Sequence, residues 1–410
     1  MKTRALSKRR PLLRVLLVSG AAALLTHGAV AASGPLKVFI LAGQSNMQGH
    51  ANVRTLDYIG KDPKTAPMLK EMVGADGTPK VCERVWITYT SPDRGETEKN
   101  GKLTTGFGAN EECLGPELEF GITMEKQLGE PILLIKTAWG GKSLNTDFRP
   151  PGSGPYVFGE ARLEKLKQQG KDIAAEKAAK TEATGHYYRL MIEQVKKVLA
   201  DPKKYCPAYE ASRGIELSGF VWLQGWNDLV DSGTYPQRDK PGGYDDYSKV
   251  LAQFIRDVRG DLKAPQLPFV IGVMGVGGPT SEYGPDEQRY KVTHQSFRDA
   301  MAAPANMPEF KGSVVNVLTE KCWDPLQKSA DKKREEVRNK INKMKKDGHK
   351  FARGEEEQLF TKMMAETCTP EELEAYKGMS HLAFHYLGSA KVLSCIGKSF
   401  AEAMGPLVKK

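Results

Sequence analysis

Residues 38–47, VFILAGQSNM, join an apolar run directly to a Gly-Gln-Ser-Asn turn. A run that is hydrophobic on both alternating faces is typical of a parallel strand covered by helices on two sides. Ligands bind at the carboxyl ends of such strands, so Ser45 would lie at the functional edge of the sheet. The alternative is a tight turn with a capping serine.

Short apolar runs alternate with amphipathic stretches along the rest of the chain, a pattern typical of a parallel sheet with crossover helices. Right-handed crossovers then predict an α/β fold, a three-layer α/β/α sandwich with a doubly wound sheet. The predicted strands cover 36–42, 132–137, 219–223, 268–274 and 313–318, and the predicted helices cover 116–126, 187–199, 244–258, 290–301 and 387–404.

Two segments interrupt this alternation. Residues 81–112 are rich in Gly, Thr and charge, which predicts a long loop or small hairpin walling the site. Residues 326–378 hold 13 Lys or Arg against 11 Asp or Glu. This balanced, helix-forming composition predicts a charged helical insertion, a surface hairpin turning near 347–348 or 353–354.

The first 31 residues have the pattern of a cleaved signal peptide, with a basic start, the apolar run 15–25 and Ala29-Val30-Ala31. That apolar run is too short to span a bilayer. The remaining domain, 32–410, has 54 basic and 50 acidic residues, net +4. No basic stripe with interleaved aromatics occurs, so we expect a periplasmic or secreted protein with no nucleic-acid partner and no stable membrane insertion.

Six cysteines lie far apart in the sequence, without the CxxC spacing of zinc or redox sites. An oxidising compartment allows some of them to pair. Cys82 with Cys113 is the expected pair because both flank one loop-rich segment, and free buried thiols are the alternative.

Gly43-Gln44-Ser45-Asn46-Met47 resembles the first block of the sialate O-acetylesterase and acetylxylan esterase branch of SGNH (GDSL-type) hydrolases. Three further blocks follow in the same order, and the resemblance covers about 300 residues outside the charged insertion. It implies the flavodoxin-like SGNH sheet and a serine esterase in which Ser45 is the nucleophile. No cofactor and no metal are implied.

The second and third blocks imply an oxyanion hole, a set of N–H donors that stabilises the charge of a tetrahedral intermediate. Trp139-Gly140-Gly141-Lys142-Ser143 would supply a glycine N–H from Gly140 or Gly141. Trp222-Leu223-Gln224-Gly225-Trp226-Asn227-Asp228 would supply a side-chain amide, from either Gln224 or Asn227. A turn capped by Asp228 is the structural alternative for the third block.

The fourth block, AFHYLG at 383–388, implies that His385 is the catalytic base, with His381 as the fallback. The family commonly has Asp three residues before this histidine, where this chain has Leu382. The site is therefore either a Ser-His dyad or completed by an acid from elsewhere, with Asp324 as the candidate. Asp324 is otherwise a turn residue before proline.

The remaining histidines are assigned no role. His50 is expected to point outward from the loop after Ser45, and together with His381 and His385 it is too dispersed to predict a metal site.

The expected substrate is an acylated carbohydrate, an O-acetyl ester on sialic acid or on a plant or algal polysaccharide, contacted by Gln44, Asn46 and Arg149. A structural salt bridge is the alternative for Arg149. Two other functions stay open: a catalytically silent carbohydrate-binding protein, motivated by Leu382, and a lipid or aryl esterase of the GDSL kind.

Overall fold

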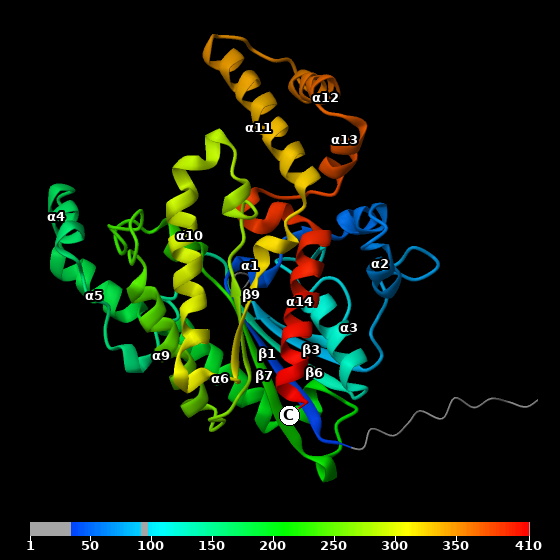
Figure 1. Cartoon of the computed structure of the whole chain (residues 1–410), viewed down its shortest axis with the longest axis vertical. Helices are drawn as coiled ribbons and strands as arrows, with labels where there is room; N and C mark the ends of the chain where they lie inside the picture. Colours follow the sequence, from blue (N-terminus) through cyan, green and yellow to red (C-terminus); the bar gives the residue numbers. More distant parts are fainter. Residues whose placement is uncertain (1–33, 92–96, 410) are drawn as a thin grey trace, which may run out of the picture. The chain divides into compact units, whose positions relative to one another are not determined.

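The computed structural model describes residues 34–91 and 97–409, so the predicted signal peptide, 1–31, lies outside the described residues. A seven-stranded sheet in the order β4-β3-β6-β1-β7-β8-β9 forms its centre (Figure 1). The strands are β1 (Leu36–Gly43), β3 (Val85–Ser91), β4 (Thr97–Lys102), β6 (Ile132–Ala138), β7 (Ile215–Leu223), β8 (Phe269–Val273) and β9 (Val314–Leu318), and a separate pair joins β2 (Ala51–Asn52) to β5 (Cys113–Leu114).

Five parallel strands have the flavodoxin-like order that the sequence predicts. Among these five, β6 lies on one side of β1 and β7, β8 and β9 lie on the other, which is the order 2-1-3-4-5, while β3 adds a sixth parallel strand beside β6. All five predicted strands are confirmed within a few residues at each end. Because the strand order reverses at β1, the sheet opens for ligands at the carboxyl ends of β1 and its neighbours.

Helices cover both faces of the sheet and complete the three layers (Figure 1). On one face lie α3 (Glu117–Leu128) and α14 (Ala390–Val408), and on the other lie α6 (His186–Ala200), α9 (Asp245–Asp261) and α10 (Gln288–Ala302). These are the five predicted helices. The smaller helices are α1 (Ser45–Gln48), α2 (Ala66–Met72), α4 (Glu160–Gln168), α5 (Ile173–Ala183), α7 (Pro202–Tyr205) and α8 (Trp226–Val230).

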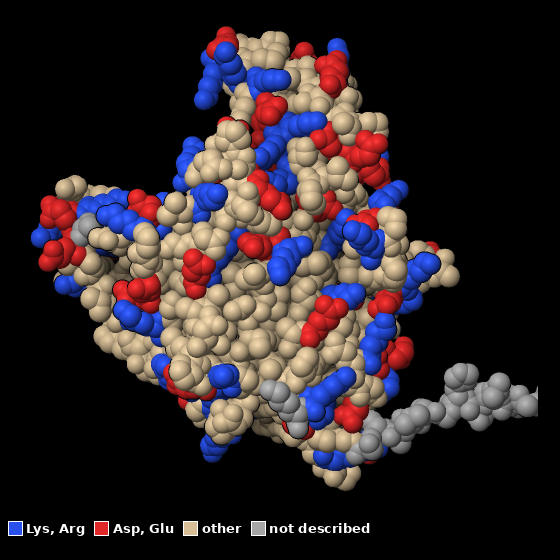
Figure 2. Space-filling model, in the orientation of Figure 1, with Lys and Arg blue, Asp and Glu red and all other residues tan. Residues whose placement is uncertain are grey.

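The charged insertion is helical, as predicted. It consists of α11 (Pro325–Lys346), α12 (Glu355–Thr367) and α13 (Pro370–Lys377), with the reversal between Lys346 and Glu355. Val337, Ile341, Phe360 and Met364 form a small core of its own. On the face seen in Figure 2, basic and acidic side chains are intermixed over this segment.

The segment 81–112 contains a hairpin rather than one long loop. β3 pairs with β4 antiparallel and with β6 parallel, so this hairpin extends the sheet at one edge. The hairpin alternative is therefore confirmed, and its edge strand β4 exposes polar side chains such as Asn100 and Lys102.

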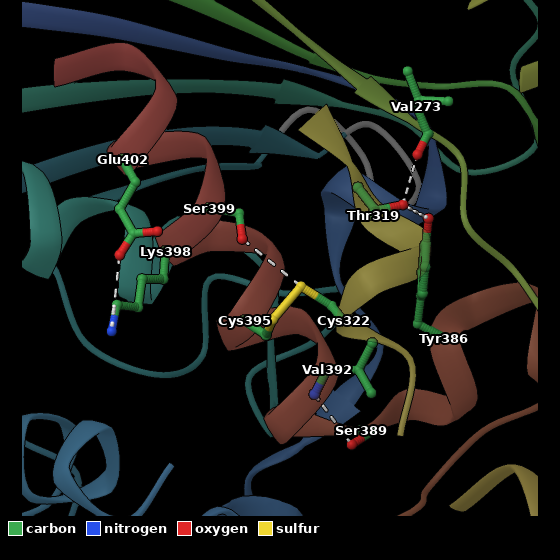
Figure 3. The surroundings of a disulfide bond; sticks show 10 residues. All are labelled: Val273, Thr319, Cys322, Tyr386, Ser389, Val392, Cys395, Lys398, Ser399 and Glu402. Atoms are coloured by element: carbon green, nitrogen blue, oxygen red, sulfur yellow. Dashed lines mark hydrogen bonds and ion pairs between the residues drawn. A yellow bond between two sulfur atoms is a disulfide. The ribbon is translucent and has the colours of Figure 1, made fainter. Parts of the chain in front are cut away.

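The expected Cys82–Cys113 disulfide is wrong. Both of these cysteines are free, and the disulfide joins Cys322 to Cys395, 73 residues apart (Figure 3). This bond connects the turn after β9 to α14 and brackets the whole charged insertion.

A buried ion pair lies beneath the end of α1. Lys136 of β6 and Glu117 of α3 are both 0% exposed, with Nζ and Oε2 2.8 Å apart. The other N–H groups of the Lys136 ammonium reach the carbonyl oxygens of Gln48 (2.8 Å) and Phe107 (2.7 Å). Burial lowers the pKa of Lys136, and the Glu117 carboxylate opposes that shift. With all three donors satisfied, the ammonium ties α1, the 106–108 loop and α3 to the sheet.

Among the described residues, no helix combines the length and the apolar character needed to cross a bilayer.

Replacing Lys136 by Met should destabilise the fold strongly, because Glu117 would keep a buried charge without its partner. We expect a loss of about 3–5 kcal/mol in the free energy of unfolding, measured by urea denaturation. Lys249→Met is the matched control, since the Lys249–Asp246 pair is 73% and 79% exposed and should contribute little. Equal effects of the two substitutions would contradict this interpretation.

Candidate active site

The turn that carries Ser45 is fixed between two neighbouring strands. The Gln44 N–H donates to the Leu223 carbonyl at the end of β7 (3.3 Å), and the Gly43 carbonyl accepts from the Trp139 N–H after β6 (3.2 Å). A Cβ added at Gly43 would lie 2.0 Å from the Leu223 oxygen, so only glycine fits here. Ser45 is therefore held at the opening of the sheet.

Ser45 is the first residue of α1 but not its cap. The cap is Gln44, whose Oε1 accepts from the Asn46 N–H (3.0 Å) and also from the Ser45 hydroxyl. The alternative that Ser45 merely caps a turn is therefore wrong. Gln44 takes the Asn46 N–H, and the Ser45 N–H, the first of α1, has no partner within this helix.

Three histidines gather next to this turn, contrary to the expectation that His50 points outward. The rings of His50 and His385 stack at a centroid distance of 3.9 Å and 10° between planes. The Nδ1 atoms of His381 and His385 are 3.2 Å apart, and one nitrogen from each of the three rings lies within 4.8 Å of the others. The sequence-based statement that these residues are too dispersed for a metal site is therefore wrong.

The contacts of His381 determine which nitrogen of His385 is free. The Leu382 N–H donates to His381 Nδ1 at 2.8 Å, so this nitrogen carries a lone pair. The contact between the two Nδ1 atoms then requires the proton to be on His385 Nδ1, which leaves the Nε2 lone pair available. Burial, and secondarily His50 and His381, lower the pKa of His385 to about 3, so its ring is neutral at pH 7.

A strained turn places His385. The residues after it, Tyr386 and Leu387, have φ of 51° and 61°, a conformation that costs energy in residues other than glycine. The Tyr386 hydroxyl compensates by accepting from the Gly275 N–H (3.0 Å) and bonding to Thr319 Oγ1 (2.6 Å), as Figure 3 shows for Thr319. His385 is thus positioned from the ends of β8 and β9. In this structure the Ser45 hydroxyl bonds to Gln44 rather than to a histidine.

The structure does not bring Asp324 to the histidines. Its Oδ1 accepts from the Gln327 N–H (3.0 Å) as the cap of α11, and its Oδ2 pairs with Lys391 (2.6 Å). Both oxygens are engaged elsewhere, so the contacts fit the turn-and-cap alternative. His381, four residues before His385, contacts the His385 ring near the position where the family commonly has an acid.

The third block holds the second block in place through Asp228. This buried carboxylate accepts from the backbone N–H groups of Leu144 (2.7 Å) and Asn145 (3.0 Å), from Gln224 Nε2 (2.5 Å) and from the Tyr235 hydroxyl (3.2 Å). Burial raises its pKa to about 6, and those hydrogen bonds oppose the shift. Asp228 is more than a local cap, because it fixes the loop that follows Gly140 and Gly141.

The two amides that the sequence could not separate have different environments. Gln224 Nε2 donates to Asp228 and to the Lys142 carbonyl (3.1 Å), so both of its N–H groups are used. Asn227 is half-buried and makes no hydrogen bond within the described residues. Gly141 has φ of +74° and open space where a Cβ would lie, which keeps its backbone accessible.

The residues predicted to contact the substrate lie in two different places. Gln44 and Asn46 flank Ser45 and are buried, and Asn46 Oδ1 has no partner. Arg149 forms no salt bridge; its guanidinium donates to the carbonyls of Gly154 (2.7 Å) and Ser153 (3.0 Å). Arg149 and Asn145 also line a polar cavity of about 480 Å³ beside α9. This cavity adjoins the loop that Asp228 holds.

Sequence reasoning missed His50 and Tyr386 as parts of the site and gave His381 only as the fallback base. The available signal for His50 was Gly49, whose φ of +89° turns the chain back after the four-residue α1. The signal for His381 was its spacing of four residues from His385.

A family model described as "Carbohydrate esterase, sialic acid-specific acetylesterase" matches residues 35–307, which include the first three blocks. No curated protein matches the chain. Among solved structures, the chain is similar to a protein from Arabidopsis thaliana, with 17% identity and TM-score 0.37 over 70% of this chain and 86% of that one. The chain is also similar to a carbohydrate acetylesterase from Xanthomonas citri, with 15% identity and TM-score 0.38 over 70% of this chain. The match covers 51% of that protein, so this chain spans about half of its length.

Replacing Asp228 by Asn should loosen the loop after Gly141, since the amide keeps one oxygen for one of the Leu144 and Asn145 N–H groups and its nitrogen cannot accept from the other. Each buried group left without a partner costs roughly 1–3 kcal/mol, and hydrogen exchange at these two amides should accelerate. Asp246→Asn is the control because that side chain is 79% exposed. Unchanged exchange at Leu144 and Asn145 would show that the loop does not depend on Asp228.

Proposed function

Because the chain belongs to the carbohydrate esterase family of sialic acid-specific acetylesterases and is a carboxylic ester hydrolase, we propose that it removes O-acetyl groups from a carbohydrate with Ser45 as nucleophile. The family match carries this proposal, since it spans Ser45 and both oxyanion blocks. The geometry supports it by placing Ser45 at the opening of the sheet beside three neutral histidines.

In the proposed reaction, the Ser45 hydroxyl turns from Gln44 toward His385 and attacks the acetyl carbonyl. His385 Nε2 takes the hydroxyl proton, and a new Oγ–C bond forms as the carbonyl oxygen becomes an oxyanion. Collapse breaks the bond to the sugar oxygen, which receives the proton from His385. Water then attacks the acetyl-serine with the same base, and acetate leaves.

The oxyanion is stabilised by three kinds of donor: the Ser45 N–H, a glycine N–H at Gly140 or Gly141, and a side-chain amide. We assign the amide to Asn227, because Gln224 already uses both N–H groups on Lys142 and Asp228. One such donor can contribute about 10² to 10³ in rate.

His381 acts as the positioning residue for His385 in place of a triad acid. Its Nδ1 lone pair faces His385 Nδ1 at 3.2 Å and keeps the proton on the side away from Ser45. A neutral ring stabilises the imidazolium formed in the reaction less than a carboxylate does. It nevertheless fixes the tautomer and the ring orientation.

Export is part of the proposal. The predicted signal peptide implies a periplasmic or secreted enzyme, and the Cys322–Cys395 disulfide supports an oxidising compartment. The acetylated sugar would be one such as sialic acid or a plant or algal polysaccharide.

Ser45→Ala should lower kcat for acetyl esters by a factor on the order of 10⁴ to 10⁶, the loss expected for a serine nucleophile. Acetate release from 4-nitrophenyl acetate, acetylated xylan and O-acetyl sialic acid would measure it. Ser212→Ala is the control, because Ser212 is exposed and remote from the histidines. Retained ligand binding with no turnover by the intact protein would favour a silent binding protein, and a preference for long-chain esters would favour a lipid esterase.

His381→Ala should lower kcat by about 10² or more with KM little changed, because His385 would lose the group that fixes its tautomer. His381→Asn, whose side-chain oxygen can replace the Nδ1 acceptor, should restore part of kcat. Steady-state kinetics and thermal unfolding of both variants separate positioning from stability. A His381→Ala enzyme with undiminished kcat would eliminate the positioning role.

A further inference from the structure

The cluster of His50, His381 and His385 has the composition of a metal-binding group. The three rings come from two segments: His50 follows α1, while His381 and His385 belong to the turn before α14. One nitrogen from each lies within 4.8 Å of the other two. Imidazole nitrogens are ligands for zinc, copper and nickel ions.

His50 has no role in the proposed esterase reaction and has an unexplained nitrogen. Its Nε2 is buried and has no hydrogen-bond partner. By contrast, His294 Nδ1 pairs with the Tyr283 hydroxyl at 2.7 Å. A buried polar atom without a partner requires an explanation such as water or an ion. The three-histidine cluster offers that explanation.

The spacing fits tetrahedral coordination. Zinc binds imidazole nitrogen at about 2.0–2.1 Å, so two ligands of a tetrahedron lie about 3.3–3.4 Å apart. His381 Nδ1 and His385 Nδ1 are 3.2 Å apart, close to that edge.

We propose that His50, His381 and His385 bind one borderline transition-metal ion, such as Zn²⁺, and that this ion reversibly inhibits the esterase. The inhibition, unlike the metal binding, rests on the proposed function. The positive charges of Lys136 and Arg334 act on the cluster and repel a bound cation. None of the three ligands is a carboxylate that would offset this repulsion. The affinity should therefore be weaker than that of a structural zinc site.

Inhibition follows from the tautomer of His385. An ion bound at His385 Nδ1 takes the lone pair there, so the Nδ1 proton must leave and Nε2 must carry a proton instead. One proton leaves the ring and one joins it, so its charge is unchanged. The ring then has no lone pair facing Ser45 and cannot accept the hydroxyl proton. His381 Nδ1 binds the ion only if it releases the Leu382 N–H, from which it accepts at 2.8 Å, and His50 contributes the lone pair of its ring.

The experiment uses the full folded protein, freed of metal with a chelator, and titrates it with Zn²⁺ by calorimetry and with Co²⁺ by visible absorption. We expect one ion per chain, the intense d–d bands of tetrahedral Co²⁺, and loss of acetate release in step with occupancy. Chelator should restore activity. Because the Co²⁺ spectrum does not depend on turnover, it tests the site even if the proposed function fails.

His50→Phe is the decisive variant, since a phenyl ring can still stack on His385 but has no nitrogen. Metal affinity should fall by about 100-fold or more, because even outer-shell partners contribute about 10- to 100-fold. Zinc inhibition should weaken equally, and His349→Ala should change neither. No binding to the unmodified protein, or binding that His50→Phe leaves intact, would overturn the site, and binding without inhibition would overturn the regulatory half.

Discussion

The buried Lys136–Glu117 ion pair is the interaction on which the active-site framework depends. A lysine in the middle of a central strand costs several kcal/mol in desolvation unless each N–H finds an acceptor. Here the acceptors are the Glu117 carboxylate and two carbonyls, one of them at the end of α1. The Lys136 ammonium therefore joins α1, the 106–108 loop and α3. These elements are held to β6 as one rigid unit beneath Ser45.

The site joins parts with very different local structure. Ser45 and the loop after Gly141 are held by regular strands and by buried hydrogen bonds, with Asp228 linking the ends of β6 and β7. His385 instead follows β9 by many residues and reaches the site through a strained turn. The hydrogen bonds of the Tyr386 hydroxyl to Gly275 and Thr319 hold this turn in its strained conformation. Strain that is held in this way is typical of functional positions.

The sequence predicted the strands and main helices well because long apolar runs and 3.6-residue periodicity depend on local chemistry. It did not predict the roles of Lys136 and Glu117, since a lysine inside a strand and an acid at a helix start each have an ordinary local explanation. The four blocks predict roles for Ser45 and His385, but the contacts of His50 and His381 depend on how two distant turns meet. The disulfide was missed for a similar reason, because spacing alone does not determine connectivity.

The Cys322–Cys395 bond also changes what backbone cleavage would do to the molecule. The charged hairpin α11–α13 lies between these two cysteines, and its reversal between Lys346 and Glu355 is rich in exposed Lys and Arg. A trypsin-like protease that cuts there would leave two fragments, one carrying Ser45 and the other His385. The disulfide would keep these fragments covalently together, so under oxidising conditions a nicked molecule could still retain both halves of its site.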